Sequence, residues 1–379
     1  MQRSLRLDEG VLLRAALIDS GASRPQRLFL AANHLGVDAV SWRILTEDLE
    51  LAVSQLLESR PVSLPPKSTS FKSWAEKLES HARSPEMERE LPRWAALTSP
   101  AFPTDAQGAN TLASARTLSV SLEADTTRLL IQEAAASWRA RPDELLLSAL
   151  GVALSRSFGL SSVLVDLEGH GREAVVPGVD LSRTVGWFTS IAPVRLSVPG
   201  HASLGDNLRG VRDSVRALPM RGIGYGLLRY LGQPHAVDAL RALPTAPVSF
   251  NYLGQLDASA AASSLFALSS EASGPVQGEG GLRSHLIDLN AVVLEGRLKL
   301  DFSYSHHLHT AERIQAVAEA YLAVLRELVS LRSSPETLRY TPTDFPLATV
   351  DADTLARLVP GGTVIEDLYP LSPTQQGML

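Results

Sequence analysis

The stretch LFLAANHLGVD, residues 28–38, joins an apolar run typical of a β-strand to a histidine and an aspartate four residues apart. It places an ionisable ring where a buried strand ends and a loop begins. Imidazole has the unshifted side-chain pKa closest to neutral pH, so His34 can take or give a proton there. One pair spaced like His34 and Asp38 is expected by chance among 9 histidines and 41 acidic residues. The rest of the chain therefore decides whether this pair of residues is functional.

The composition is typical of a soluble globular protein. The chain has 379 residues, of which 45% are hydrophobic and 20% charged, and its net charge is −6. This length predicts two lobes, or two domains plus an appendage. No basic run points to nucleic acid as a partner, and no apolar stretch is long enough to span a membrane. The lack of cysteine excludes thiol catalysis and disulfides, and the N-terminus lacks the apolar segment of a signal peptide, which together favour the cytoplasm.

Hydrophobic periodicity predicts the elements of the first part of the chain. Two strands are expected over 11–18 and 27–32, the second a central buried strand because it is mostly apolar. Apolar residues then recur at helical spacing from Trp42 to Leu56, and Ser41 is expected to cap this helix. A further helix is expected over 71–97. The polar stretch after it predicts a lobe boundary near residue 112.

The second part mixes strands and helices without a regular alternation, which favours an α+β fold. Strands are expected over 115–122, 163–167, 191–198 and 247–253, and helices over 125–139, 142–158 and 310–331. Residues 286–294 and 298–304 flank Glu295-Gly296 and predict a hairpin. The second arm alternates, with Leu298, Leu300, Phe302 and Tyr304 on one face.

The segment EGHGRE, residues 168–173, directly follows the strand expected over 163–167. Two glycines within three residues permit unusual backbone conformations or close approach of a ligand. A carboxylate beside such a loop can point into a cleft, where partial burial raises its pKa toward neutrality. Glu168 is therefore a candidate acid or base. The alternative is a surface turn in which Glu168 is exposed and Arg172 forms a salt bridge.

Residues 181–190, 222–226 and 250–255 combine glycines with aromatic residues. Loops of this composition can let a thin, extended ligand run along the backbone while a ring walls the channel; packing at strand ends is the alternative. The glycines in 222–226 do not form a dinucleotide-binding fingerprint, because their spacing is G-x-G-x-G. The histidines in 306–309 have no nearby carboxylate or thiol to complete a metal shell, so no metal site is expected.

Together these segments resemble the epimerization domain of a non-ribosomal peptide synthetase, within the condensation-domain superfamily. Residues 33–42 (NHLGVDAVSW) match the family motif HHxxxDGxSW. The other matches are EGHGRE at 168–173, RTVGWFTS at 183–190, GxGYG at 222–226 and FNYLGQ at 250–255. Residues 340–347 resemble the closing segment of such a domain. Residues 371–379 resemble the opening of a following condensation domain.

The resemblance implies two chloramphenicol-acetyltransferase-like lobes in a V-shaped arrangement, with the active site in the tunnel between them. It implies inversion of the Cα of an aminoacyl or peptidyl thioester. This substrate would be carried on the phosphopantetheine arm of an upstream peptidyl carrier protein, and a downstream condensation domain would be the second partner. No cofactor bound by the chain itself, no nucleic acid and no membrane is implied.

The matching motifs carry residue roles over to this chain. His34 and Glu168 are the two expected proton-handling residues, and which of them abstracts the proton is left open. Asn251 and Tyr252 would line the site or bind the enolate. Asp38 would hold the histidine loop by pairing with an arginine, and Arg172 and Arg183 are the candidates.

The sequence departs from the family at Asn33, which replaces the first motif histidine, and at Ala39, which replaces a glycine. Only 32 residues precede Asn33, so we expect an incomplete first lobe. The expected domains are a partial N-terminal lobe with the histidine motif (1–112), a C-terminal lobe with the glutamate motif (113–347), a linker (348–362) and the start of a following condensation domain (363–379).

Three functions fit this sequence. The first is epimerization of the carrier-bound residue from L to D, which the motifs around Glu168, Trp187 and Tyr252 favour. The second is condensation-type acyl transfer, in which His34 would position an attacking amine for peptide bond formation. The third is an inactive fragment that only docks carrier protein.

Overall fold

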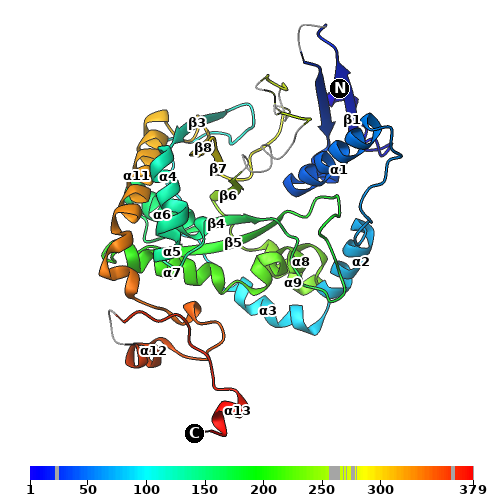
Figure 1. Cartoon of the computed structure of the whole chain (residues 1–379). Helices are drawn as coiled ribbons and strands as arrows, with labels where there is room; N and C mark the ends of the chain where they lie inside the picture. The colour runs from blue at the N-terminus through cyan, green and yellow to red at the C-terminus, as the bar shows by residue number, and fades with distance from the viewer. Residues whose placement is uncertain are drawn as a thin grey trace.

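A six-stranded sheet lies at the centre of the computed structural model, which describes residues 1–21, 25–255, 265–267, 269, 271–274, 278, 280–359 and 363–378. The strands follow the order β3-β8-β7-β6-β4-β5 (Figure 1). They are β3 (Ala115–Ser121), β4 (Ser162–Gly169), β5 (Ser190–Ser197), β6 (Val248–Gln255), β7 (Ile287–Leu294) and β8 (Arg297–Ser305). The β4–β6 and β6–β7 pairs are parallel, so the carboxyl ends of these three strands meet at one edge.

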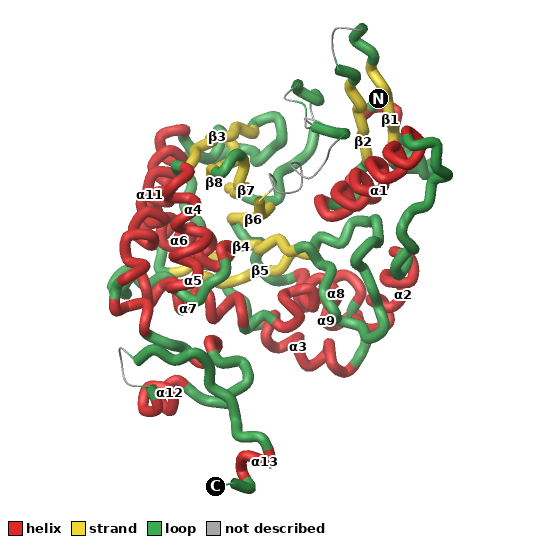
Figure 2. Tube along the Cα trace, in the orientation of Figure 1, coloured by secondary structure: helices red, strands yellow, loops and turns green. Residues whose placement is uncertain are grey.

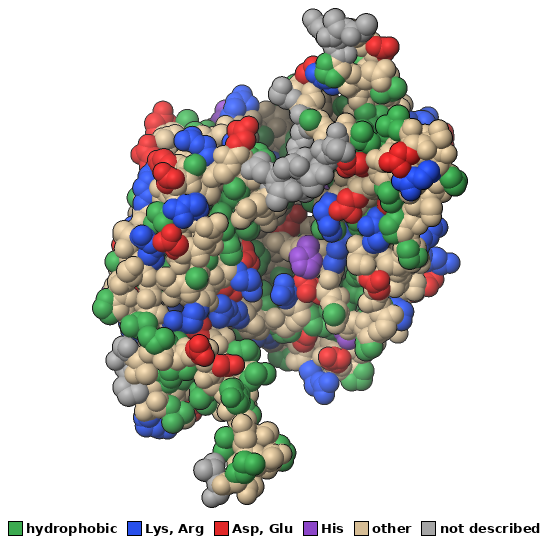
Figure 3. Space-filling model, in the orientation of Figure 1, with side chains coloured by type: hydrophobic (Ala, Val, Ile, Leu, Met, Phe, Trp, Pro, Cys, Tyr) green, Lys and Arg blue, Asp and Glu red, His purple; other side chains and the backbone are tan. Residues whose placement is uncertain are grey.

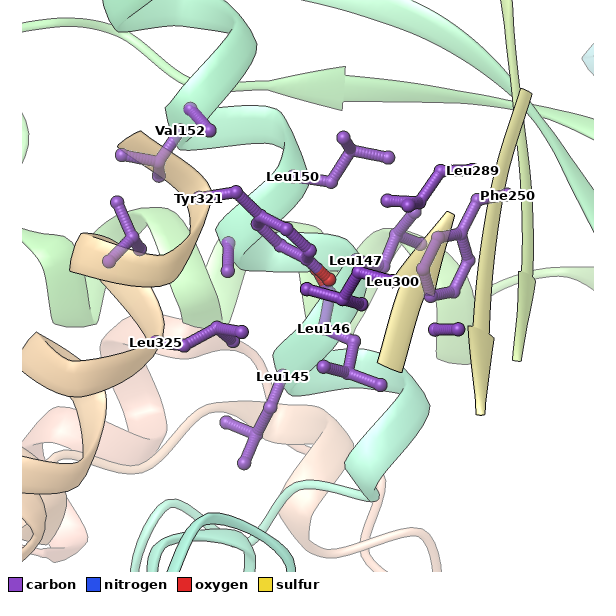
Figure 4. Packing of buried hydrophobic residues seen from close by; sticks show 14 of the residues in the cluster. Leu145, Leu146, Leu147, Leu150, Val152, Phe250, Leu289, Leu300, Tyr321 and Leu325 are labelled. Carbon is purple, nitrogen blue, oxygen red and sulfur yellow. The ribbon is translucent and has the colours of Figure 1, made fainter. Parts of the chain in front are cut away.

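Helices cover one face of the sheet and form the main hydrophobic core with it. The helix α6 (Pro142–Phe158) packs between α7 (Leu204–Arg216) and α11 (Ala311–Ser330), as Figure 2 shows. A helix covered on several sides needs apolar residues around its circumference, and residues 145–154 supply them. Leucines of α6 surround Tyr321 (Figure 4), whose hydroxyl donates a hydrogen bond to the Leu146 carbonyl oxygen at 3.0 Å. The apolar face predicted for the second hairpin arm is buried in this core.

The opposite face of the sheet is polar. In the register of the parallel strands, Asp166 lies beside Ser249, and Ser249 lies beside Asp288. Side chains two residues apart in a strand share a face. Glu168 and Asn251 therefore lie on the same face as this row, one step nearer the carboxyl ends of β4 and β6. The sheet thus separates an apolar core from a polar surface that can carry chemistry.

The N-terminal part of the chain lies on the side of the sheet away from α11 (Figure 1). It contains β1 (Leu13–Ile18), β2 (Arg27–Ala32), α1 (Ala39–Leu57), α2 (Phe71–Ala82) and α3 (Pro85–Ala95). The expectation of a central buried strand over 27–32 is wrong. Within the described ranges β2 pairs with β1 alone, and Ala31 is its one buried residue. An apolar run signals a strand without fixing how many neighbours that strand has.

Three expectations about helices are corrected. Asp38 rather than Ser41 caps α1, because the Asp38 carboxylate accepts a hydrogen bond from the Ser41 amide at 2.7 Å. The helix expected over 71–97 is two helices, since Ser84 caps a new helix that begins at Pro85. The helix expected over 125–139 is formed by α4 (Ala124–Arg128), a π-helical stretch η3 (Leu129–Ala134) and α5 (Ala135–Ser137).

Residues 222–226 are mostly helical rather than a loop. Gly222, at a φ of 92°, precedes α8 (Ile223–Leu231), and the next two glycines lie inside this helix. Glycine lowers helix propensity, but packing of α8 against α2 and α3 outweighs it here. Helices α7 and α9 (Pro234–Arg241) were not expected from the sequence. The remaining predicted strands and helices, including the hairpin at Glu295-Gly296, are confirmed.

Short helical turns follow α11: η5 (Leu331–Ser333), η6 (Pro335–Leu338), η7 (Pro342–Asp344), α12 (Ala352–Leu358) and α13 (Pro373–Gln376). Asp344 ties this segment to α7, because its carboxylate accepts hydrogen bonds from Arg212 at 2.9 Å and from Arg216 at 3.4 Å. The linker predicted over 348–362 contains α12. Residues 360–362, and Leu379 of the predicted following domain, lie outside the described residues. The predicted domain boundaries stay predictions.

None of the helices within the described ranges has the length and hydropathy needed to cross a lipid bilayer.

Leu150 is buried in α6, at the centre of the core. Leu150→Ala removes side-chain carbons and leaves a cavity, so we expect the free energy of unfolding to fall by about 3 kcal/mol. Urea denaturation followed by circular dichroism measures this loss. Leu57→Ala is the control, because Leu57 is 71% exposed at the end of α1, and its effect should stay within about 0.5 kcal/mol. Equal losses in the two variants would contradict the assigned core.

Candidate functional site

A cavity of about 430 Å³ lies at the carboxyl ends of β4 and β6. The start of α1 contributes Asp38 and Ala39, β4 contributes Glu168, and β6 contributes Asn251 and Tyr252. Figure 3 shows one face of the molecule hollowed near its centre, where charged side chains and a histidine gather. The cavity thus brings together residues that lie far apart in the chain.

His34 begins the short helical turn η2 (His34–Gly36), directly after β2. Asn33 caps this turn, since its side chain accepts a hydrogen bond from the Leu35 amide at 3.0 Å. The imidazole is exposed and packs on the indole of Trp187, with 5.2 Å between the ring centroids. His34 does not itself line the 430 Å³ cavity. When protonated, this imidazole nevertheless favours ionisation of the Glu168 carboxyl.

Glu168 is the second-to-last residue of β4 and lies on the polar face of the sheet. The glycine-rich loop (residues 169–173) directly follows it. The side chain of Glu168 is half-buried, and its carboxylate accepts no hydrogen bond from any residue that the structure describes. Burial raises the pKa of Glu168 above its ordinary value, and the nearby His34 imidazole opposes that rise. A carboxyl group with a raised pKa and no fixed partner binds a proton more readily than an ordinary glutamate and is suited to proton transfer.

The Asp38 and Arg172 side chains form an ion pair between the histidine loop and the glycine-rich loop. The Nη2 atom of Arg172 lies 3.0 Å and 3.2 Å from the two carboxylate oxygens of Asp38. Nη1 donates to the carbonyl oxygens of Leu181 and Thr184, and the guanidinium lies over the Phe188 ring. The Asp38 side chain is 5% exposed and the Arg172 side chain 9%. Arg172 is therefore the partner of Asp38 among the two arginines considered.

Arg183 has a different role. It pairs with Glu47 and Asp48 of α1. Ser41 of the same helix accepts a hydrogen bond from the Gly186 amide at 3.0 Å and donates one to the Gly186 carbonyl oxygen at 2.9 Å. The segment that contains Arg183 and Gly186 is therefore bound along α1, beside the Asp38–Arg172 pair.

The glycine-rich loop requires glycine at position 171. Gly171 has a φ of 64°, and a Cβ atom there would lie 1.6 Å from the Phe188 carbonyl oxygen. A side chain at this position would separate the loop from residues 188–190.

Asn251 and Tyr252 follow one another in β6 and both line the cavity. Alternation puts Asn251 on the polar face beside Glu168, whereas Tyr252 packs against the main core. Burial raises the pKa of the Tyr252 phenol, with a smaller contribution from the Asp143 carboxylate. The phenol therefore keeps its proton at neutral pH and can donate a hydrogen bond into the cavity.

A second cavity of about 590 Å³ adjoins the first, and Thr189 lines both. Trp187, Tyr225 and Tyr230 wall it, and Asp166 and His285 also line it. Asp166 and His285 were not expected from the sequence; they are 119 residues apart and within hydrogen-bond distance in the structure. No local motif links them. The acidic residue inside the apolar strand before Glu168 was the one available signal.

We find no group of three or more histidine, aspartate or glutamate side chains arranged to hold a metal ion in the part of the chain that the structure describes.

Comparisons with known proteins point to one family. A sequence profile described as the condensation domain matches residues 1–345. Linear gramicidin synthase subunits C and D of Brevibacillus parabrevis are 41% and 39% identical to the chain, each across 100% of it. The chain spans only 5% and 8% of the lengths of these relatives.

A solved structure gives the same indication. The epimerization domain from the third module of tyrocidine synthetase B superposes with a TM-score of 0.80 at 33% sequence identity. The match covers 87% of this chain and 74% of that one. This similarity confirms the α+β fold expected for a condensation-type domain.

Replacing Arg172 should weaken the contact between the loop that contains Asp38 and the glycine-rich loop. Arg172→Ala leaves the Asp38 carboxylate buried without its partner, so we expect a loss of about 3 kcal/mol in the free energy of unfolding. Arg183→Ala is the control, because its carboxylate partners are 45% and 29% exposed, and its loss should be about 1 kcal/mol or less. Urea denaturation measures both. A loss for Arg183→Ala that matches or exceeds that of Arg172→Ala would contradict this ranking.

The same pair should make stability depend on pH. Burial alone would raise the pKa of Asp38, but hydrogen bonds from Ser41 and Arg172 outweigh it and hold the pKa below the ordinary 3.8. Such a group adds stability that is full above its unfolded pKa and is lost as the pH falls through its folded pKa. We expect Asp38→Asn, which cannot titrate there, to lose less stability than the wild type below about pH 4. Melting temperatures across this range test the point, and equal losses would contradict it.

Proposed function

Because the chain belongs to the condensation domain family, we propose that it inverts the Cα of an aminoacyl or peptidyl thioester carried on the phosphopantetheine arm of a carrier protein. The observation that carries this proposal is the placement of Glu168. It is a half-buried carboxyl group without a hydrogen-bond partner among the described residues, on a cavity wall, within electrostatic reach of His34. The 33% identity to a tyrocidine synthetase epimerization domain supports it.

The reaction exchanges one weakly acidic proton between the two faces of the Cα. The thioester lowers the barrier because the carbanion is delocalised as an enolate. The protein must then supply a base on one face, an acid on the other, and a hydrogen-bond donor for the enolate oxygen. His34 and Glu168 come from segments 134 residues apart in the chain and approach from different elements, which suits work on opposite faces.

Because its pKa is raised, Glu168 is a stronger base than an ordinary glutamate, which helps it to accept a proton. In one direction of inversion Glu168 accepts the Cα proton and His34 returns one to the other face. In the reverse direction the two residues exchange these roles. The Tyr252 phenol and the Asn251 amide are the proposed donors to the enolate oxygen, since both line the same cavity.

The partners in this proposal are an upstream peptidyl carrier protein, which delivers the thioester, and a downstream condensation domain, which receives the inverted residue. The relatives are large synthases of which the chain covers a small part, which fits a domain that works on cargo delivered by its neighbours.

Condensation is the second candidate, because the matching family profile is that of the condensation domain. In that reaction His34 would orient the attacking amine of one carrier-bound residue toward the thioester of another, and Glu168 would have no proton to move. The two reactions therefore differ in the fate of the Cα hydrogen.

Deuterium exchange distinguishes these functions. The chain is incubated in D₂O with pantetheine thioesters of L-alanine, L-leucine and L-phenylalanine, and mass spectrometry and chiral chromatography follow the Cα. We expect deuterium at the Cα together with the D-isomer. Peptide bond formation with an added acceptor amine, without exchange, would overturn the proposal in favour of condensation. If a folded chain catalyses neither reaction, carrier docking is the function that remains.

Substitutions then test the two residues. We expect His34→Ala and Glu168→Gln each to lower the exchange rate by about 100-fold or more. His235→Ala and Asp301→Asn are the controls, because His235 pairs with Glu88 at the surface and Asp301 accepts a hydrogen bond from Ser119 in β3. Full exchange in either test variant removes that residue from the mechanism.

A further inference from the structure

Three charged side chains form a linear cluster on the polar face of the sheet, apart from the proton-handling pair. The ring of His285 lies between two carboxylates: Nε2 is 2.9 Å from Asp166 Oδ2, and Nδ1 is 3.1 Å from Asp288 Oδ1. The three side chains are 13%, 21% and 30% exposed, in that order. Both ring nitrogens are thus occupied.

The parallel strands build this cluster. Asp166 of β4 and Asp288 of β7 are separated by Ser249 of β6 in one row across the sheet. His285 precedes β7 and spans the row from one carboxylate to the other. Ser249 donates a hydrogen bond to Asp288 Oδ1, and Arg283 donates one to Asp288 Oδ2, each at 2.6 Å. Every member is therefore fixed by at least one neighbour on another element.

The cluster holds His285 as a cation. Burial alone would lower the pKa of His285, but the hydrogen bonds and charges of Asp166 and Asp288 outweigh it and raise the pKa to about 9. Asp288 behaves in the complementary way. Burial would raise its pKa, but hydrogen bonds from His285 and Ser249 and the charge of Arg283 lower it. At neutral pH the row therefore contains two anions with a cation between them.

Glu168 lies on the same face, two residues beyond Asp166 on β4, and its carboxylate has no hydrogen-bond partner among the described residues. The Asp288 carboxylate opposes ionisation of Glu168, whereas the His285 cation favours it. Without His285, the Asp288 carboxylate would raise the pKa of Glu168 further, and the His285 cation opposes that rise.

We propose that His285 is a positioning residue for Glu168: clamped between Asp166 and Asp288, it neutralises the carboxylates beside Glu168 and keeps that carboxyl group able to release its proton. This inference rests on the proposed function only for its catalytic consequence. His285 has no free ring nitrogen with which to touch substrate, so it acts through Glu168 rather than on the reacting atoms.

Other charged groups also face this region and define what the experiment must hold constant. His34 acts on Glu168 from η2, and Arg229 of α8 lines the second cavity with His285. The remaining charged groups that line the cavity of Glu168, besides Asp38, are Arg141, Asp143, His170, Glu173, Arg216 and Arg221. None of these is altered in the variants below.

The test measures the titration of Glu168 directly. The protein is labelled with ¹³C at the glutamate δ-carbon, and the Glu168 signal is assigned by its disappearance in Glu168→Gln. His285→Gln removes the cation and leaves two carboxylates, so we expect the titration midpoint of Glu168 to rise by about one pH unit. Asp288→Asn removes a like charge while Asp166 still pairs with His285, so we expect the midpoint to fall.

Opposite shifts in the two variants are the signature of this role, because a structural disturbance would not move the midpoint in opposite directions. Asp301→Asn is the matched control, since it removes a carboxylate from the same sheet face on β8 and should leave the midpoint unchanged. Shifts of the same sign in both variants, or no shift in either, would overturn the proposal. If His285→Gln does not fold by circular dichroism, the downward shift in Asp288→Asn decides alone.

The pH dependence of deuterium exchange supplies the functional readout. If Glu168 must ionise to act, the acidic limb of the rate profile moves upward in His285→Gln and downward in Asp288→Asn. A wild-type chain with no exchange would defeat the proposed function, yet the NMR titration would still report whether the cluster controls Glu168. The proposed function and the proposed role of His285 can therefore be contradicted independently.

Discussion

The ion pair between Asp38 and Arg172 is the contact on which the geometry of the site depends. Asp38 follows the turn that carries His34 and caps α1, and Arg172 lies in the loop that directly follows Glu168. One buried pair therefore fixes the ends of two segments that are distant in the chain. Removing either partner would leave the other as a buried charge without a counter-ion, which costs free energy of unfolding. The hydrogen bonds of Ser41 with Gly186 also attach the start of α1 to the segment that contains Gly186, beside this ion pair.

The sheet supplies the second requirement, a rigid surface with polar groups at one edge. The helices α6, α7 and α11 cover its apolar face, and Asp166, Glu168 and Asn251 face the cavities on the other. Because β4, β6 and β7 are parallel, residues from three strands lie in rows across that face. Two cavities meet there at Thr189. In the proposed reaction, this arrangement would give a carrier-bound thioester room on both sides of the reacting carbon.

The sequence predicted the strands that carry Glu168 and Asn251, because short apolar runs between turn residues are strong local signals. It also predicted that Asp38 would pair with an arginine, through motifs matched to a known family. The cap at Asp38 and the new helix at Ser84-Pro85 are local capping interactions that hydrophobic periodicity does not reveal. The helix at Ile223, in contrast, depends on packing against α2 and α3. The clamp on His285 could not be predicted, because Asp166 is 119 residues away from it in the chain, although Asp288 follows His285 by three residues.

The central claim is that His34 and Glu168 act on opposite faces of one carbon. A crystal structure with a carrier arm that bears a stable amide analogue of the aminoacyl thioester tests this claim most directly. The account predicts that the Cα lies between the His34 imidazole and the Glu168 carboxyl, each within proton-transfer distance. An analogue seated with its Cα beyond the reach of either group, or with both groups on one face, would contradict it.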